Sequence, residues 1–302
     1  MALGIAVVLA LAASVCTATS SLCQRMGAAP APGGDHFSVK LIWYLVRQPI
    51  WLAGVASMIL GFGFQITALH FGGLALVQPI LASELLFVFL YMAALGWREV
   101  SRSDWLAATA MAAGLGVFLF TADPSGGRVH APALTWWLAG GASLGLATLT
   151  TLGAYVPLGR GSAPSAARKA ATLGIATGIS WGFVAAVIKE LSAHSGGFAS
   201  IFTSWPLYVL LGVGAASMLV ASHALQAGPL AASQPGFTIV DPLVASLLGV
   251  FVFREHLRLQ PLAVLVEVVA LAALVSGVVA LSRSRIVQGH VHDDEAKLAL
   301  SP

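Results

Sequence analysis

The chain has 302 residues, of which 58% are hydrophobic and only 9% are charged, with a net charge of +3 and a mean hydropathy of +0.89. Soluble globular domains carry about 25% charged residues, so this composition excludes a water-exposed globular protein. The small net charge argues against a nucleic-acid-binding surface. The sequence therefore predicts an all-α polytopic membrane protein that has the lipid bilayer around it and no nucleic acid partner.

Nine apolar stretches, each of about 20 residues, are long enough to cross a hydrocarbon core of roughly 30 Å. They cover residues 2–22, 50–70, 73–96, 105–122, 134–155, 170–190, 205–226, 230–253 and 261–282. A short apolar segment at 37–46 contains Lys40 and is compatible with an interfacial helix or a degenerate tenth transmembrane helix. We expect a first transmembrane repeat over 1–122, a second over 134–285, and a flexible cytoplasmic tail over 286–302.

The positive charges are distributed unevenly between alternate loops. One set of loops holds eleven Lys and Arg residues: Arg25, Lys40, Arg47, Arg98, Arg102, Arg160, Arg168, Lys169, Arg283, Arg285 and Lys297. The other set holds four: Arg128, Lys189, Arg254 and Arg258. Because cytoplasmic loops are enriched in Lys and Arg, nine helices predict an outside N-terminus and a cytoplasmic C-terminus in the plasma (inner) membrane. A tenth helix would turn only the N-terminus inward.

Two parts of the chain repeat each other at an offset of 156 residues. Residues 68–79 (ALHFGGLALVQP) correspond to 224–235 (ALQAGPLAASQP), and the same offset pairs Arg98-Glu99 with Arg254-Glu255. Between 68–106 and 224–262, 12 of 39 positions are identical, whereas apolar composition alone predicts about four. Five predicted crossings separate equivalent helices, an odd number, so the two copies are expected to be inverted. Inverted repeats are typical of secondary transporters, with the substrate site at the repeat interface near the midplane.

The repeated residues also follow an AL…P…GE pattern. It reads Ala68-Leu69, Pro79 and Glu99 in the first copy, and Ala224-Leu225, Pro235 and Glu255 in the second. This pattern resembles the repeat of the drug/metabolite transporter (DMT) superfamily, EamA-type, although Arg98 and Arg254 replace the Gly before the Glu. Asp241-Pro242 resembles an acid–Pro pair of that family's second copy. The resemblance implies membrane transport but does not define the substrate.

The number of helices differs from that family's usual arrangement. The family has five helices per repeat, whereas the first copy here is expected to lack its second helix. Nine helices are closer to the NIPA-like magnesium transporter branch.

Two acidic residues lie at the centres of predicted transmembrane helices. Glu84 is central in 73–96 and Asp241 is central in 230–253. A carboxylate at this depth costs several kcal/mol unless it is protonated, paired or facing water. Two of them in equivalent helices predict a proton relay or a cation-binding site, with protonated carboxyls bonded to neighbouring helices as the structural alternative.

Further candidate residues surround these acids in the sequence. Gln78 and Gln234 are expected to line the same site, and Pro79 and Pro235 each free the carbonyl four residues earlier, which either lines a cavity or marks a packing kink. His223 is a weaker candidate, since a lone intramembrane His more often bonds a neighbouring helix.

Residues near the helix ends have a different expected role. Glu99 and Glu255, each beside an Arg, predict local salt bridges at the membrane interfaces. Gln65 and His70 lie near the end of one predicted helix and Gln226 near the end of another. Glu267 is a third membrane acid that lies nearer one surface.

No hydrolase, protease or nucleotide-binding motif occurs in the sequence, so we expect no enzyme activity and no cofactor. The sequence favours a proton-coupled secondary transporter for uptake or efflux of a metabolite, drug or other small molecule by alternating access. A divalent-cation (magnesium) transporter and a non-transporting membrane scaffold or sensor partner are the alternatives. A metal site is left open, since His290, His292, Asp293 and Asp294 fit a solvated tail better than a ligand set.

Overall fold

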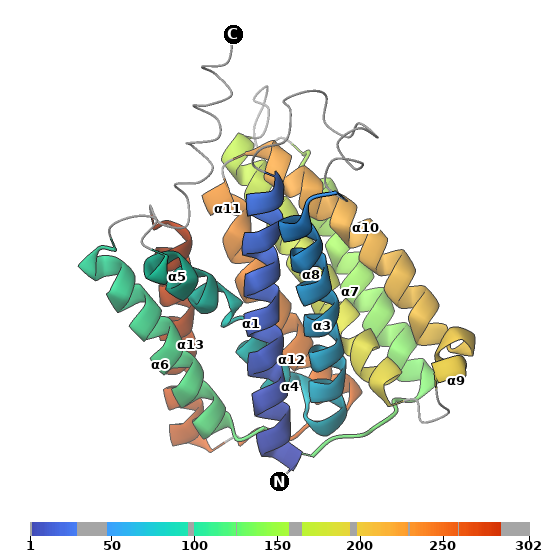
Figure 1. The fold of residues 1–302 in the computed structure, drawn as a ribbon. Coiled ribbons are helices and arrows are strands. Elements are labelled where there is room, and N and C mark those ends of the chain that lie inside the picture. The colour runs from blue at the N-terminus through green and yellow to red at the C-terminus, as the bar shows by residue number, and fades with distance from the viewer. Residues whose placement is uncertain are drawn as a thin grey trace.

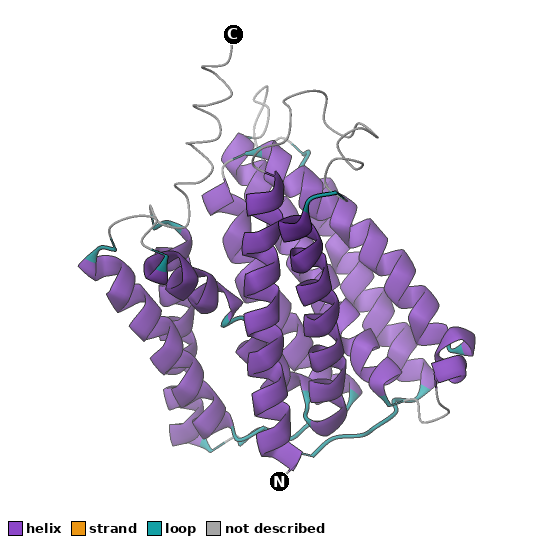
Figure 2. Ribbon diagram, in the orientation of Figure 1, coloured by secondary structure: helices purple, strands orange, loops and turns teal. Residues whose placement is uncertain are grey.

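The computed structural model describes residues 2–28, 47–95, 100–124, 126–156, 165–193, 198–228, 230–258 and 260–284, and the regular elements in these ranges are helices (Figures 1 and 2). In chain order they are α1 (Ala2–Ala28), α3 (Pro49–Phe71), α4 (Leu74–Leu81), α5 (Glu84–Ala94), α6 (Arg102–Ala122), α7 (Ala133–Gly153), α8 (Ala166–Ser192), α9 (Phe198–Thr203), α10 (Trp205–Ala227), α11 (Leu230–Pro235), the π-helical turn η1 (Gly236–Val240), α12 (Asp241–Val252) and α13 (Pro261–Ser282). The predicted all-α class is confirmed for these residues.

Seven helical segments in the described ranges are long and apolar enough to cross a membrane. They are Leu3–Gln24, Pro49–Phe71, Leu74–Ala94, Arg102–Ala122, Ala166–Ser192, Trp205–Ala227 and Pro261–Leu281. Their outward faces carry large apolar side chains, such as Phe120 at 85% and Leu262 at 74% exposure. Such a surface requires lipid rather than water, so the chain is a membrane protein. Helix α7 is not among the seven and Gly236–Val252 is a shorter apolar helix, so nine crossings stay a prediction.

Close helix packing holds the bundle together. Helix α1 packs along α3, α8 along α10, and α6 along α13. A Cβ added at Gly114 of α6 would lie 2.5 Å from the Leu274 backbone nitrogen of α13, and one at Gly277 of α13 would lie 2.6 Å from that of Met111 in α6. The two backbones therefore touch at glycines, as in other small-residue membrane interfaces.

Helix α8 is deeply buried and forms the centre of the second half. Its Gly174, Gly178 and Gly182 follow one another at four-residue spacing, so they share one helix face. A Cβ at these positions would lie 2.5 Å from Ser233 O, 2.4 Å from Gly236 O and 2.8 Å from Val244 Cβ, respectively. The glycine face lets η1 and the start of α12 lie directly on α8, which positions Asp241.

Two inner helices are interrupted shortly after their prolines. Pro79 lies inside α4, which ends at Leu81, and the chain resumes as α5 at Glu84. Pro235 ends α11, the π-helical turn η1 follows, and α12 begins at Asp241. The carbonyl of Ile80, exposed by the first break, accepts hydrogen bonds from Ser83 N at 3.0 Å and from the Ser14 hydroxyl of α1 at 3.1 Å. Glu84 is thus the first helical residue after a break, whereas Asp241 directly follows the π-helical turn within the apolar helix Gly236–Val252.

Several sequence predictions concern residues outside the described ranges. These are the segment 37–46, the Arg98-Glu99 pair and the tail 286–302. The backbone of Gln234 belongs to α11, but the structure does not describe its side chain.

Candidate functional site

A polar cavity of about 380 Å³ lies between the two halves of the chain. Its walls come from α1, α3, α4 and α5 on one side and from α8, η1 and α12 on the other. The lining residues are Thr17, Ser21, Leu22, Gln65, Gln78, Leu81, Ala82, Glu84, Leu85, Val88, Trp181, Phe237, Thr238, Asp241 and Pro242. The structure therefore gathers Glu84, Asp241 and Gln78 in one cavity.

The Glu84 carboxylate lies at the first turn of α5, beside the C-terminal part of α1. The Ser21 hydroxyl donates a hydrogen bond of 3.0 Å to Glu84 Oε1. A helix N-terminus favours a negative charge because its first backbone N–H groups lack intrahelical partners. The break before α5 thus places Glu84 where a carboxylate is tolerated at membrane depth.

Asp241 and Gln78 bring unsatisfied hydrogen-bonding atoms to the cavity. Asp241 Oδ1 and Gln78 Nε2 are both buried, and neither has a hydrogen-bond partner within the described structure. Gln78 is only 3% exposed. A buried acceptor or donor without a partner costs about 1–3 kcal/mol, and such atoms are rare in native proteins. The two residues are therefore positioned to bind something that enters the cavity.

The rest of the wall combines the polar side chains of Thr17, Ser21, Gln65 and Thr238 with apolar and aromatic ones. Trp181 of α8 and Phe237 of η1 line the cavity, and their ring centroids lie 5.4 Å apart at an interplanar angle of 36°. Among the described lining residues there is no Lys, Arg or His. The cavity thus combines two acidic side chains with an aromatic surface.

The other predicted residues lie elsewhere, except Gln65, which lines the cavity. His223 is exposed on α10, and its Nδ1 lies 2.7 Å from the Leu219 carbonyl of its own helix, so the structure does not bring it to the cavity. His223 lies away from the cavity because it is on the outward face of α10. Gln226 is also exposed. Glu267 is not a lining residue of the cavity, although its Oε1 is buried and has no hydrogen-bond partner in the described part of the chain.

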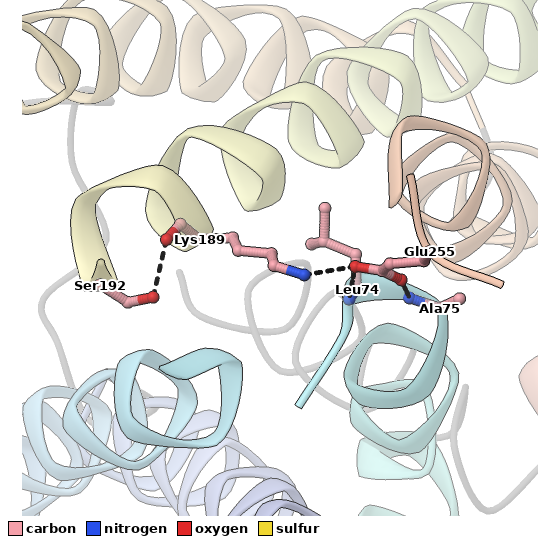
Figure 3. Close-up of polar contacts among 5 residues, drawn as sticks. All are labelled: Leu74, Ala75, Lys189, Ser192 and Glu255. Atoms are coloured by element: carbon pink, nitrogen blue, oxygen red, sulfur yellow. Dashed lines mark hydrogen bonds and ion pairs between the residues drawn. The ribbon is translucent and has the colours of Figure 1, made fainter. Parts of the chain in front are cut away.

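Glu255 forms the centre of a buried cluster at the end of the bundle where α4 begins (Figure 3). Its Oε1 accepts hydrogen bonds from Leu74 N at 2.8 Å and from the Lys189 ammonium of α8, and its Oε2 accepts one from Ala75 N at 2.9 Å. The carboxylate therefore caps α4 from the other half of the chain. The ion pair of Glu255 is with Lys189 and not with the neighbouring Arg254. Arg254 adopts a left-handed conformation (φ 58°) as the chain turns after α12.

The Glu255 cluster has closely fitted surroundings. The Lys189 ammonium lies 4.6 Å from the centroid of the buried Phe253 ring, an arrangement typical of a cation–π contact. A Cβ at Gly73 or Gly249 would approach Glu255 Oε2 to 2.6 Å. Two glycines thus leave the space that the carboxylate occupies.

A second cavity, of about 310 Å³, lies on the other side of this cluster. It is lined by Leu3, Leu69, His70, Phe71, Gly72, Gly73, Pro124, Gly126, Gly127, Arg128, Val129, Lys189, Ser192 and Ala193. Residues 74–77 of α4 are buried, and the polar cavity begins only at Gln78. This turn of α4, held by Glu255, separates the two cavities.

Next to Lys189, Glu190 makes a separate set of contacts. Its Oε1 lies 2.9 Å from His130 Nδ1, and its Oε2 accepts a hydrogen bond of 3.2 Å from Ala131 N, just before α7. The adjacent residues Lys189 and Glu190 therefore fix two different segments to the same end of α8.

Sequence reasoning missed several residues of these sites. Lys189 was predicted to be a loop cation, although it is only 6% exposed. The hydroxyls of Thr17 and Ser21 and the ring of Trp181 gave no signal in apolar stretches. The four-residue spacing of Gly174, Gly178 and Gly182 was a usable signal, since it predicts a close helix contact beside Trp181.

Comparison with known proteins gives one relative of unestablished function. An uncharacterized protein of Corynebacterium glutamicum is 28% identical over 286 residues, which cover 93% of this chain and 95% of that protein. No protein-family model matches the chain. No solved structure matches it either. This chain is therefore similar, over nearly its full length, to that protein.

Proposed function

We propose that this chain is a secondary transporter that moves a small molecule across the plasma membrane by alternating access. The observation that carries the proposal is the polar cavity, where Glu84, Asp241 and Gln78 meet between the two halves. Broken helices with polar groups at the break are characteristic of transporter substrate sites. Glu84 and Asp241 bind the substrate or a coupled proton, and Gln78 orients the substrate.

The proposed architecture has nine crossings in two inverted repeats. In support, the 156-residue offset relates both ends of α3 to those of α10, Pro49–Phe71 and Trp205–Ala227. Helix α3 ends at the end of the bundle where α10 begins (Figure 1). Because α1 packs along α3 as α8 packs along α10, α1 is the counterpart of α8, and the first copy lacks a counterpart of α7. This assignment differs from the sequence-based expectation of a missing second helix, and it keeps the proposed resemblance to the EamA-type repeat.

The positive-inside distribution orients the proposed transporter. The described basic residues Arg47, Arg102, Arg168, Lys169 and Arg283 lie near the bundle end opposite Glu255, and this end is proposed to be cytoplasmic together with the C-terminus. The Glu255 cluster then lies at the outer end. In this proposal the cluster closes the path between the two cavities, so the polar cavity is open toward the cytoplasmic side only.

Cysteine accessibility tests the proposal without knowledge of the substrate. Cys16 and Cys23 are replaced by Ser, and Thr17→Cys and Thr238→Cys place single thiols in the cavity. We expect a membrane-impermeant maleimide to label both positions in sealed vesicles of either orientation, because the cavity opens to each side in turn. The control is Phe120→Cys, whose position is exposed to lipid and is expected to stay unlabelled. Absence of labelling at both cavity positions from both sides contradicts transport and favours a scaffold.

A further inference from the structure

We propose that a groove between α7, α8 and α10 binds one acyl chain of a membrane glycerophospholipid, whose ester carbonyl accepts a hydrogen bond from Trp136. This lipid site is separate from the polar cavity and does not depend on the transport function. The position of the groove, its lining and one unpartnered hydrogen-bond donor support it.

The groove has a volume of about 670 Å³ and lies where three helices meet (Figure 1). Helix α8 packs directly against both α7 and α10. Phe183 of α8 belongs to the lining although it is only 3% exposed, so the groove reaches the central helix between its two neighbours. The lining residues are Ala131, Ala133, Trp136, Trp137, Gly140, Gly141, Leu144, Phe183, Trp205 and Val209.

The groove opens on a surface that faces lipid. Helices α8 and α10 are long and apolar enough to cross a membrane, and Leu134 and Leu138 of α7 are 70% and 66% exposed. None of the ten lining residues carries a charge, a hydroxyl or an amide side chain. A Cβ added at Gly141 would meet nothing within 4 Å, so this glycine leaves the groove open. An apolar chain is therefore the occupant that the wall fits.

The groove extends from the membrane interface toward the hydrocarbon core. Trp205 is the first residue of the membrane-capable segment Trp205–Ala227, and Trp136 is the fourth residue of α7. Tryptophans at helix ends lie at the level of the lipid headgroups. Leu144 follows Trp136 by eight residues, or about 12 Å along the helix. The tryptophans thus lie near the ester carbonyls of a lipid, and Gly141 and Leu144 lie at the depth of its acyl chain.

Trp136 supplies a donor that favours a lipid over a second copy of this chain. Its side chain is 9% exposed, and its Nε1 is buried without a hydrogen-bond partner in the described part of the chain. A buried donor without a partner is costly. Glycerophospholipids carry ester carbonyls with free acceptor sites, whereas the backbone carbonyls of a transmembrane helix are bonded within that helix. A lipid therefore satisfies both the apolar wall and the indole N–H.

Trp136 also connects the groove to the Glu255 cluster. Its ring lies edge-to-face with those of Trp205 and Phe253, at centroid distances of 5.1 Å and 5.9 Å. The Phe253 ring in turn lies 4.6 Å from the Lys189 ammonium that pairs with Glu255. A chain in the groove packs against these aromatic rings. Because a ligand that binds only the folded state stabilises it, bound lipid is expected to raise the melting temperature.

Lipid add-back to the purified protein tests the site. Delipidated protein in detergent is titrated with dioleoylphosphatidylcholine, and native mass spectrometry counts the bound lipids. We expect one lipid per chain to bind more tightly than any other and to raise the melting temperature. Gly141→Leu should weaken its binding about tenfold or more, because the new side chain fills the groove. Trp136→Phe, which keeps a ring and removes the N–H, should weaken it about threefold or more.

The matched control is Gly145→Leu on the same helix. Gly145 is also exposed, a Cβ there would also meet nothing within 4 Å, and it is not a lining residue of the groove. This variant should bind the lipid as the wild-type protein does. Melting curves without lipid identify a variant that has lost its fold; if Gly141→Leu has, Trp136→Phe decides alone.

Two results overturn the lipid site. One is binding of several lipids with equal affinity, unchanged in Gly141→Leu and Trp136→Phe, which means adventitious binding only. The other is a wild-type dimer that carries no tight lipid and dissociates in both Gly141→Leu and Gly145→Leu, which assigns this face of α7 to a second copy. Thiol labelling at Thr17→Cys and Thr238→Cys does not involve the groove, so failure of the lipid site and failure of the transporter are distinguishable.

Discussion

Lys189 and Glu255 form a buried ion pair although 66 residues separate them in the chain. The pair joins the end of α8 to the segment after α12, and the same carboxylate binds the first two backbone amides of α4. A buried ion pair repays its desolvation only when further hydrogen bonds satisfy its remaining atoms. Here the amides of α4 supply those bonds, so three elements depend on one carboxylate.

Removal of one partner of this pair should destabilise the protein strongly. We expect Lys189→Met to lower the free energy of unfolding by about 3–5 kcal/mol, because it leaves Glu255 buried without its counter-ion. The double variant Lys189→Met/Glu255→Gln should recover part of that loss. Unfolding of the purified protein in detergent measures both. Arg258→Gln is the control, since the exposed Arg258–Asp123 pair is worth only about 0–1 kcal/mol; an equal loss in that variant would contradict the assignment.

The same pair is expected to control access to the polar cavity from the outer side. In Lys189→Met, a thiol at Thr17→Cys should react faster with a membrane-impermeant maleimide that is added outside, because α4 is no longer held against α8. The labelling rate from the cytoplasmic side should fall as the outward-open population grows. Unchanged rates on both sides would mean that the pair is only a structural contact.

Gly249 leaves space for the Glu255 carboxylate. Gly249→Ala would place a Cβ 2.6 Å from Glu255 Oε2, and we expect a destabilisation of about 1–3 kcal/mol from this overpacking. Gly141→Ala in α7 is the matched helical control, because nothing in the described structure lies within 4 Å of its added Cβ. That control should be neutral or stabilising by up to about 1 kcal/mol. Thermal unfolding of the two variants under the same conditions measures this difference in stability.

The glycine face of α8 should control the position of Asp241. Gly178→Ala would place a Cβ 2.4 Å from the Gly236 carbonyl and 3.2 Å from Asp241 N. Because backbone atoms cannot give way cheaply, η1 must move and Asp241 moves with it. We expect a destabilisation of about 1–3 kcal/mol from this overpacking, measured by thermal unfolding. Gly212→Ala, where the added Cβ meets no described atom within 4 Å, should be as stable as the wild-type protein.

Transport should depend on both cavity acids. In proteoliposomes with an imposed proton gradient, we expect the wild-type protein to carry a proton-coupled flux, because Glu84 and Asp241 both line the cavity. The Glu84→Gln/Asp241→Asn variant should lose this flux. Full flux in this variant, measured with a pH-sensitive dye inside the vesicles, would show that the acids have no part in transport.

The positions of Glu84, Asp241 and Gln78 in the cavity follow closely from sequence reasoning. Each was selected because a polar group is costly in hydrocarbon, and that cost depends only on composition and depth. The break after Pro79 also follows from local chemistry, because proline removes a helical hydrogen bond. Sequence patterns therefore selected three residues that line one cavity.

The direction in which the His223 side chain points was harder to predict from the sequence. His223 lies on a helix that is apolar on all sides, and apolar side chains face lipid as readily as they face other helices. The usual contrast between a buried apolar face and an exposed polar face is absent here. Sequence periodicity therefore could not reveal that His223 points away from the cavity.

The sequence by itself determined that lipid surrounds this chain, that its described elements are helices, and that two duplicated segments each carry an acid at membrane depth. Only the tertiary structure decided that Lys189 pairs with Glu255 and that Thr17, Trp181 and Asp241 share one cavity. The physical reason is that the cost of placing a charge in hydrocarbon is local and visible in composition, whereas its compensation comes from partners tens of residues away. Those partners are selected by helix packing, which in a uniformly apolar chain leaves little trace in the sequence.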